Sequence, residues 1–248
     1  MSNDLVLRAD ADGITTLTLN RPDKLNSLST PMFRVLDRHV RVIEANPAAV
    51  QCVILRGAGR CFSAGHDLGD IDAGEPSEDH AFQSGVIERL ANLPQAVVSA
   101  VHSHCYTGAL ELALAGDIIL ASANAKFADT HAKWALTPVW GMSQRLPRRV
   151  GFARAREMMF TSRTVLADEA VTIGLANHVF ADDSFDDAVL RFARSILPNS
   201  AFSIAAYKRL LADTDGMALD RGLAHEVQHS EGRGPDMAER IASFAARK

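Results

Sequence analysis

Short apolar runs of strand length alternate with helical patterns along the first half of the chain, and this order constrains the fold most. Residues 14–19 (ITTLTL), 50–55 (VQCVIL) and 96–101 (AVVSAV) are rich in β-branched side chains and predict strands. Helical patterns follow the first two strands, at about 29–46 and 80–91. Strands that alternate with helices predict an α/β fold with layered sheets and helices outside.

The middle of the chain contains a helix that is apolar on nearly every face. It covers about residues 107–116 and is followed by a predicted strand at 117–122. The acidic stretch 69–79, rich in Gly and Pro, predicts a mobile surface loop. A helix of this apolar kind is expected to be buried.

Strand patterns end at about residue 185, and helical periodicity continues to the end of the chain. We therefore divide the sequence into a core domain, 1–190, and a C-terminal helical region, 191–248. The apolar stripes of these helices need a partner, either the core or another subunit.

Composition excludes several classes of function. The 248 residues carry a net charge of −4 with both signs interspersed, which indicates neither a nucleic-acid partner nor a membrane surface. The first twenty residues lack the apolar core of a signal peptide, and no apolar run reaches the length of a membrane span. Three cysteines without ligand spacing predict buried free thiols in a reducing compartment, so we expect a cytoplasmic protein.

Glu111 is the most informative single residue, because it lies in the apolar helix. Burial would raise the pKa of this carboxyl group toward neutrality, which suits a general base. The alternative is a buried Glu that only binds backbone groups. Gly108 lies where the same helix begins, so its N–H can face developing negative charge.

A second backbone donor is predicted at His66. It follows Gly65 in FSAGHDL, where glycine allows a tight turn and a close ligand. The amides of His66 and Gly108 together could form an oxyanion hole. The imidazole of His66 either lines the pocket or contacts solvent.

Four blocks of sequence resemble the crotonase (enoyl-CoA hydratase/isomerase) family, in order and over nearly the whole chain. They are 19–29 (LNRPDKLNSLS), 61–70 (CFSAGHDLGD), 100–122 (AVHSHCYTGALELALAGDIILAS) and 125–151 (AKFADTHAKWALTPVWGMSQRLPRRVG). The resemblance implies a spiral of ββα units with a C-terminal helical trimerisation region. By position in these blocks, it also implies an oxyanion hole at His66 and Gly108, and Glu111 as the first catalytic carboxylate.

The chain departs from the family pattern at the second catalytic carboxylate. The block reads Phe127-Ala128-Asp129-Thr130-His131, so His131 occupies the Glu position, and Val139 replaces the glycine expected after Pro138. Imidazole exchanges protons near neutral pH, so His131 is either the proton-transfer partner or a histidine that merely binds Asp129. We expect Asp129 to be structural.

The resemblance further implies a bent coenzyme A, bound as part of the substrate and not as a separate cofactor. The residues expected near it or near the acyl group are Arg21, Lys24, Leu25, Ala64, Asp67, Leu68, Trp134 and Trp140. Phe82 is a further candidate for the acyl pocket, and Phe244 and Lys248 for contact with CoA.

Hydration of a 2-enoyl-CoA is the leading functional hypothesis. The alternatives are a double-bond isomerase, since one base can remove and return a proton, and an acyl-CoA-binding protein without turnover. Thioester hydrolysis and decarboxylation rank below these, because one oxyanion hole supports several reactions. We expect no metal, and a homotrimer or hexamer as the family implies.

Overall fold

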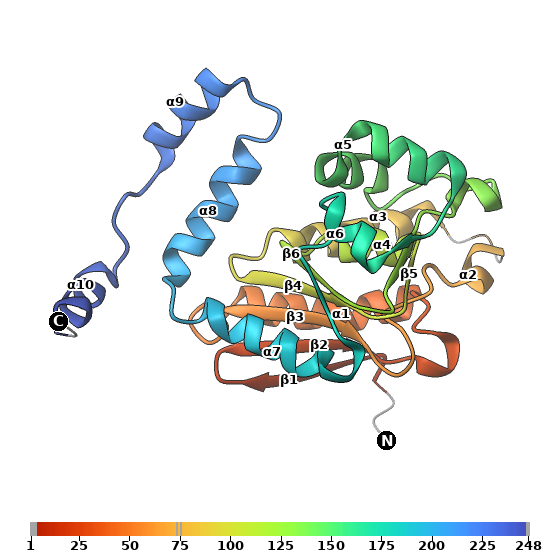
Figure 1. Cartoon of the computed structure of the whole chain (residues 1–248), viewed down its shortest axis with the longest axis horizontal. Helices are drawn as coiled ribbons and strands as arrows, with labels where there is room; N and C mark the ends of the chain where they lie inside the picture. Colours follow the sequence, from red (N-terminus) through yellow and green to blue (C-terminus); the bar gives the residue numbers. More distant parts are fainter. Residues whose placement is uncertain (1–3, 73, 75, 247–248) are drawn as a thin grey trace.

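The main sheet of the protein is six strands wide. The computed structural model describes residues 4–72, 74 and 76–246 (Figure 1). The strands lie in the order β1 (Val6–Ala11), β2 (Ile14–Leu19), β3 (Cys52–Gly57), β4 (Ala96–Val101), β6 (Ile118–Ser122) and β9 (His178–Phe180). In the part of this sheet that the structure describes, β1 and β2 form the only antiparallel pair, so the predicted α/β class is confirmed.

Both faces of the sheet are buried at its central strands β3, β4 and β6, which explains why these strands read as nearly continuous apolar runs. In β3, Val53 and Leu55 point into the larger core, whereas Cys52 and Ile54 pack on the other face against helix α7 (Phe185–Ile196). Successive side chains of a strand alternate between faces, so one run of residues supplies two cores.

The chain enters a second, smaller sheet after β4 and again after β6. The smaller sheet consists of β5 (His104–Tyr106), β7 (Lys126–Ala128) and β8 (Val165–Leu166). Because β4, β6 and β9 belong to the large sheet, the chain passes back and forth between the two sheets and spirals as it does so. This path brings the turns after β5 and β7 next to each other.

Helices close the larger core. They include α1 (Thr30–Glu44), α3 (Ser77–Ala91), α4 (Gly108–Ala113), α5 (Met142–Thr161) and α6 (Ala167–Thr172). Every residue of α4 is buried, as the apolar pattern predicts.

Three details of the sequence prediction need correction. The stretch 69–79 is not all loop: α2 (Leu68–Asp72) lies in it and α3 begins at Ser77. The apolar helix is shorter than 107–116, because Thr107 has φ 52° and ψ −111°, outside the helical region. Helix α5 had no counterpart in the prediction.

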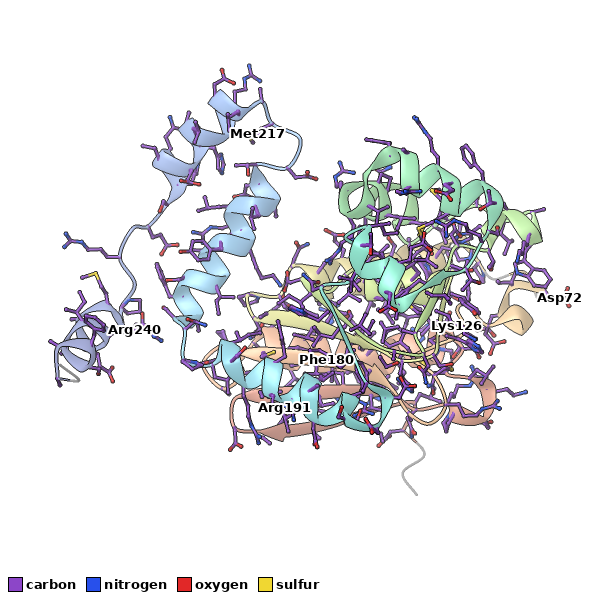
Figure 2. All side chains as sticks on the ribbon, in the orientation of Figure 1. Asp72, Lys126, Phe180, Arg191, Met217 and Arg240 are labelled. Atoms are coloured by element: carbon purple, nitrogen blue, oxygen red, sulfur yellow. The ribbon has the colours of Figure 1, made fainter. Side chains whose placement is uncertain are left out.

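The C-terminal helices lead away from both sheets (Figures 1 and 2). Helix α8 (Ala201–Asp213) is tied to the sheets by Lys208, whose Nζ donates to Asp117 Oδ2 at 2.7 Å and to the Gln95 carbonyl at 2.9 Å. Helices α9 (Leu219–His229) and α10 (Met237–Ala245) have no buried residue. Helical structure after residue 185 is as the sequence predicts.

Two further findings concern the described residues. None of their helices combines the length and apolar character needed to cross a bilayer. The three cysteines are buried and free, as predicted.

Asn26 anchors the loop between β2 and α1 to the turn that follows β3. Its buried side chain donates to the carbonyl oxygens of Ala58 and Cys61 at 2.8 Å each, and to that of Phe62 at 3.2 Å. Its Oδ1 accepts the N–H of Arg21 at 2.9 Å. Asn26 also has φ 52°, a left-handed conformation that Asn tolerates better than most residues.

Replacing Asn26 by Ala should lower the free energy of unfolding by about 3 kcal/mol, because several buried polar groups lose their partner at once. Urea unfolding followed by circular dichroism measures this change. The exposed Lys24, in the adjoining turn, is the control: Lys24→Ala should change stability by less than about 0.5 kcal/mol. Equal stabilities of the two variants would contradict the anchoring role.

Candidate active site

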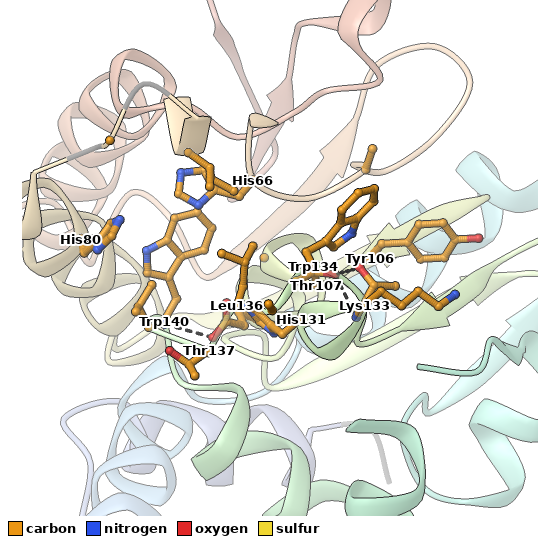
Figure 3. A pocket seen from close by; sticks show the side chains of 18 residues that line it. His66, His80, Tyr106, Thr107, His131, Lys133, Trp134, Leu136, Thr137 and Trp140 are labelled. Atoms are coloured by element: carbon orange, nitrogen blue, oxygen red, sulfur yellow. Dashed lines mark hydrogen bonds and ion pairs between the residues drawn. The ribbon is translucent and has the colours of Figure 1, made fainter. Parts of the chain in front are cut away.

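A cavity of about 560 Å³ lies between α4, the turn after β5 and the 3-10 helix η2 (His131–Trp134) (Figure 3). Several residues singled out in the sequence line it together: Ala64, His66, Gly108, Glu111, His131, Trp134 and Trp140. His66 and Trp140 lie against each other on one side of the view, with ring centroids 4.5 Å apart, and Tyr106, Lys133 and Trp134 lie on the other.

Glu111 is held by two backbone amides. It is 1% exposed, and its Oε1 accepts the N–H of Trp140 at 3.0 Å and that of Met142 at 2.9 Å. Gly141 lies between these donors with φ 109°, a conformation that L side chains rarely adopt. Glycine therefore lets the chain turn so that both amides meet one oxygen, and Oε2 is left for the cavity side.

Burial is the main influence on Glu111, and it raises the pKa of this carboxyl group above the ordinary 4.5. The amides of Met142 and Trp140 and the nearby His131 favour the ionised form and oppose this rise only in part. Such a carboxyl group can exchange a proton nearer to neutral pH than an exposed Glu does.

His131 faces Glu111 across the cavity. Its Nε2 lies 3.8 Å from Glu111 Oε2, and its Nδ1 lies 2.6 Å from Asp129 Oδ1. Asp129 is 1% exposed and His131 8%. The two interpretations of His131, as a proton-transfer partner and as a histidine that binds Asp129, are therefore compatible. The residue binds Asp129 and also presents its other nitrogen to the cavity.

The turns that carry the two predicted donors are in close contact. A Cβ atom on Gly108 would lie 3.2 Å from the backbone nitrogen of His66, and a Cβ on Gly65 would lie 2.6 Å from the Tyr106 carbonyl oxygen. Side chains at either glycine would push the turns apart. Gly108 is the first residue of α4, where helix geometry leaves its N–H without an intrahelical acceptor.

Trp140 closes the cavity against the core. It is 1% exposed, and its Nε1 donates to Gln83 Oε1 at 3.0 Å. A Cβ on Gly108 would lie 2.5 Å from its ring, so the indole fills the space beside the helix start. Trp134, in contrast, is 58% exposed at the cavity edge. Phe82 is absent from the cavity lining and packs partly buried against the core.

The residues expected near coenzyme A do not all line this cavity. Four of them are absent from its lining: Arg21, Lys24, Leu25 and Asp67. Arg21 Nη1 forms an ion pair with Asp67 Oδ2 at 2.7 Å. The loop of Leu25 is joined to the site because the Ala64 N–H donates to the Leu25 carbonyl at 2.9 Å.

The remaining predicted residues lie elsewhere. Leu68 is the first residue of α2. Phe244 is exposed on α10, which Figure 1 places far from α2 and α4. Lys248 is outside the described residues.

Several lining residues were not predicted, among them Ile71, His80, Tyr106, Lys133 and Leu136. Tyr106 lies two residues before Gly108, and Lys133 directly precedes Trp134, so closeness in the sequence to a predicted site residue was the available signal. His80 and Ile71 come from α3 and α2, and nothing in their sequence context indicates that they line the same cavity as Glu111. Within the described residues, no group of His, Cys, Asp and Glu side chains is suited to hold a metal ion.

Replacing Glu111 by Gln should stabilise the protein relative to the wild type, by an amount that increases as pH rises. Gln preserves an oxygen that accepts the two amide N–H groups. The pKa of Glu111 is raised on folding, so its neutral form contributes stability below about pH 4.5 that is lost as pH rises through the folded-state pKa. Gln cannot ionise, so the stability difference in favour of the variant should grow above pH 4.5.

Thermal or urea unfolding at several pH values measures this difference. Glu226→Gln, at an exposed position of α9, is the control and should give a flat difference. A Glu111→Gln variant that tracks the wild type at every pH would show that burial does not perturb this group.

Comparison with known proteins places the chain in a family. The family model for enoyl-CoA hydratase/isomerase matches residues 9–244. The 1,2-epoxyphenylacetyl-CoA isomerase of Escherichia coli K12 is 32% identical over 254 residues, which cover 99% of this chain and 97% of that protein.

Solved structures agree over nearly the full length. The 1.8 Å crystal structure of an enoyl-CoA hydratase from Bacillus anthracis matches with a TM-score of 0.91 and 29% identity, covering 98% of this chain and 97% of that one. A putative enoyl-CoA hydratase from Thermobifida fusca, solved in complex with acetoacetyl-CoA, matches with a TM-score of 0.84 and 26% identity, covering 97% and 96%. The chain therefore belongs to the enoyl-CoA hydratase/isomerase family, the crotonase family that its sequence blocks resemble.

Proposed function

We propose that this protein is an enzyme that adds water across the 2,3-double bond of a 2-enoyl-CoA thioester. The observation that carries the proposal is the pair of facing atoms, Glu111 Oε2 and His131 Nε2, 3.8 Å apart in the cavity beside the turns of His66 and Gly108. The reaction requires no cofactor besides the coenzyme A of the substrate.

The separation of these two atoms suits one shared water. Hydrogen bonds to a water oxygen are about 2.8 Å long, so a water can reach both atoms whenever they are closer than about 5.6 Å. At 3.8 Å the pair is too far apart for a direct hydrogen bond but well within that limit. Glu111 and His131 can then act together on the water, although only one of them is a carboxylate.

The proposed reaction moves one water onto the substrate. The Glu111 carboxylate takes a proton from the water. The water oxygen bonds to C3, and the π electrons of the 2,3-double bond move toward the thioester oxygen. The N–H groups of His66 and Gly108 stabilise the resulting enolate, with each well-placed donor contributing on the order of 3 kcal/mol to the transition state. Protonation of C2 by the Glu111 carboxyl group then restores the carboxylate, so that H and OH of one water have been added.

The thioester ligand is supported by the relative from Thermobifida fusca that was solved with acetoacetyl-CoA. In the present chain, we place the CoA portion of the ligand along the loops of Lys24, Leu25 and Ala64 and the acyl group in the cavity beside Trp140. Arg21 has a structural partner in Asp67, so Lys24 is the better candidate to meet a phosphate.

A double-bond isomerase is the second candidate, and one observation favours it. Among the described residues that line the cavity, Glu111 is the only carboxylate, and isomerisation needs one base that removes a proton and returns it elsewhere. A relative named an isomerase is 32% identical. An acyl-CoA-binding protein without turnover remains the alternative from another functional class.

Replacing Glu111 by Gln should lower turnover of 2-enoyl-CoA thioesters at least about 100-fold, because the general base is lost. Steady-state assays on a panel of 2-enoyl and 3-enoyl thioesters measure turnover, and calorimetry should show that thioester binding survives. Unchanged turnover would remove Glu111 from the mechanism. Tight binding by the wild type without turnover of any thioester would instead identify a binding protein.

Replacing His131 by Ala should separate hydration from isomerisation. Hydration should fall at least about tenfold, since the water loses one of its two partners, while any transfer of a double bond between 3-enoyl and 2-enoyl thioesters should persist. The same panel of thioesters provides the measurement. Full hydration by this variant would show that the water is not shared with His131.

We also propose that the protein assembles into a trimer or hexamer in the cytoplasm. The C-terminal helices and the connection between α8 and α9 expose large apolar side chains: Tyr207, Leu211, Met217, Leu219, Leu223, Val227, Met237, Ile241 and Phe244. Exposed apolar surface of this extent is typical of subunit contacts. Sedimentation of the wild type and of Leu223→Asp should show an oligomer that the charge weakens, and a monomeric wild type would contradict the proposal.

A further inference from the structure

A buried carboxylate holds His131 from the side opposite the cavity. Asp129 Oδ1 lies 2.6 Å from His131 Nδ1 and accepts the backbone N–H of the same residue at 3.1 Å. One oxygen thus binds both the ring and the main chain of His131, and it lies in an environment that is 1% exposed. Asp129 does not line the cavity, so it acts on a bound substrate only through His131.

We propose that Asp129 is a positioning residue that keeps the proton of His131 on Nδ1, so that Nε2 presents a hydrogen-bond acceptor to the cavity. The inference rests on the proposed hydration, in which His131 Nε2 accepts a hydrogen bond from the second O–H of the water while that hydrogen stays on the oxygen. It assigns a function to a residue that sequence reasoning treated as structural.

The two side chains differ in the hydrogen-bond donors and acceptors that they offer. A neutral imidazole has one N–H donor and one acceptor nitrogen. An ionised carboxylate only accepts, so a nitrogen 2.6 Å from Asp129 Oδ1 must carry the hydrogen. Nε2 is then the acceptor, and it faces Glu111 Oε2 at 3.8 Å. The ring therefore presents the same kind of atom that a second carboxylate would present.

The surrounding segments fix this pair of residues relative to Glu111. Thr107, which precedes α4, donates its N–H to the Ala128 carbonyl at 2.8 Å, and the hydroxyl groups of Thr107 and Thr130 lie 2.5 Å apart. The Thr130 N–H also donates to Thr107 Oγ1 at 3.1 Å. The segment that carries Asp129 and His131 is thus bound directly to the start of the helix that carries Glu111.

Other titratable groups near His131 come from several elements. Asp129 lies outside the cavity lining, and the other titratable groups within the lining are Glu111, His66, His80, Tyr106 and Lys133. Asp129 is the one whose side chain contacts Nδ1 within hydrogen-bond distance. The position of the proton on His131 should therefore respond to a change at Asp129 in particular.

The test combines nitrogen NMR with kinetics on the full-length protein. In protein labelled with ¹⁵N histidine, with the signal of His131 assigned by its loss in His131→Gln, the neutral ring should show a protonated Nδ1 and an unprotonated Nε2. Asp129→Ala should populate the other tautomer and lower kcat for hydration about 10-fold to 100-fold, with little change in KM. Asp129→Asn retains an acceptor oxygen and should preserve more of both the tautomer and kcat.

Asp37→Ala is the matched control. Asp37 is 9% exposed and binds Arg41 and Arg89, and it is absent from the cavity lining, so its loss should affect stability but neither the His131 signal nor kcat.

Two results would overturn the inference: a neutral wild-type ring with its proton on Nε2, or an Asp129→Ala variant with unchanged tautomer and unchanged kcat. The tautomer is read without turnover. A wild type that shows the expected tautomer but hydrates no thioester would therefore refute the proposed reaction and leave the role of Asp129 standing.

Discussion

The active-site region depends on the way in which one carboxylate is buried. Removing Glu111 from water disfavours its charge, and the amides of Trp140 and Met142 return part of that stabilisation without neutralising the group. The same two amides join α4 to the start of α5, so one oxygen fixes Glu111 and the wall of the cavity relative to each other. The second oxygen is then available for chemistry.

The cavity also requires that two turns of the chain pack closely, and a glycine in each turn allows this. Gly65 and Gly108 let the turns after two separate strands approach until the amides of His66 and Gly108 share one region. Trp140 then fills the space beside Gly108. The indole donates to Gln83 of α3, so the cavity wall is rigidly connected to the helical layer.

His131 is the residue on which the proposed reaction depends most, because by sequence resemblance it occupies the position of the family's second carboxylate. The structure places a buried aspartate against its Nδ1. An imidazole whose proton stays on Nδ1 presents an acceptor as a carboxylate does, so a histidine at this position is compatible with the proposed hydration. The family relationship alone does not decide between hydratase and isomerase, because both reactions use the same enolate stabilisation.

The sequence by itself determined the α/β class, the strands β2, β3 and β4, the buried apolar helix and the helical C-terminal region, because these follow from the periodicity of apolar residues. It also singled out Glu111, since a charged residue in an apolar helix is unusual. It did not predict α5, nor that His80 and Ile71 line the same cavity as Glu111. Only the tertiary structure decided that His131 lies 3.8 Å from Glu111 while its other ring nitrogen contacts Asp129, because the distance between His131 and Glu111 depends on how the segment after β7 packs against α4, and local periodicity carries no record of that packing.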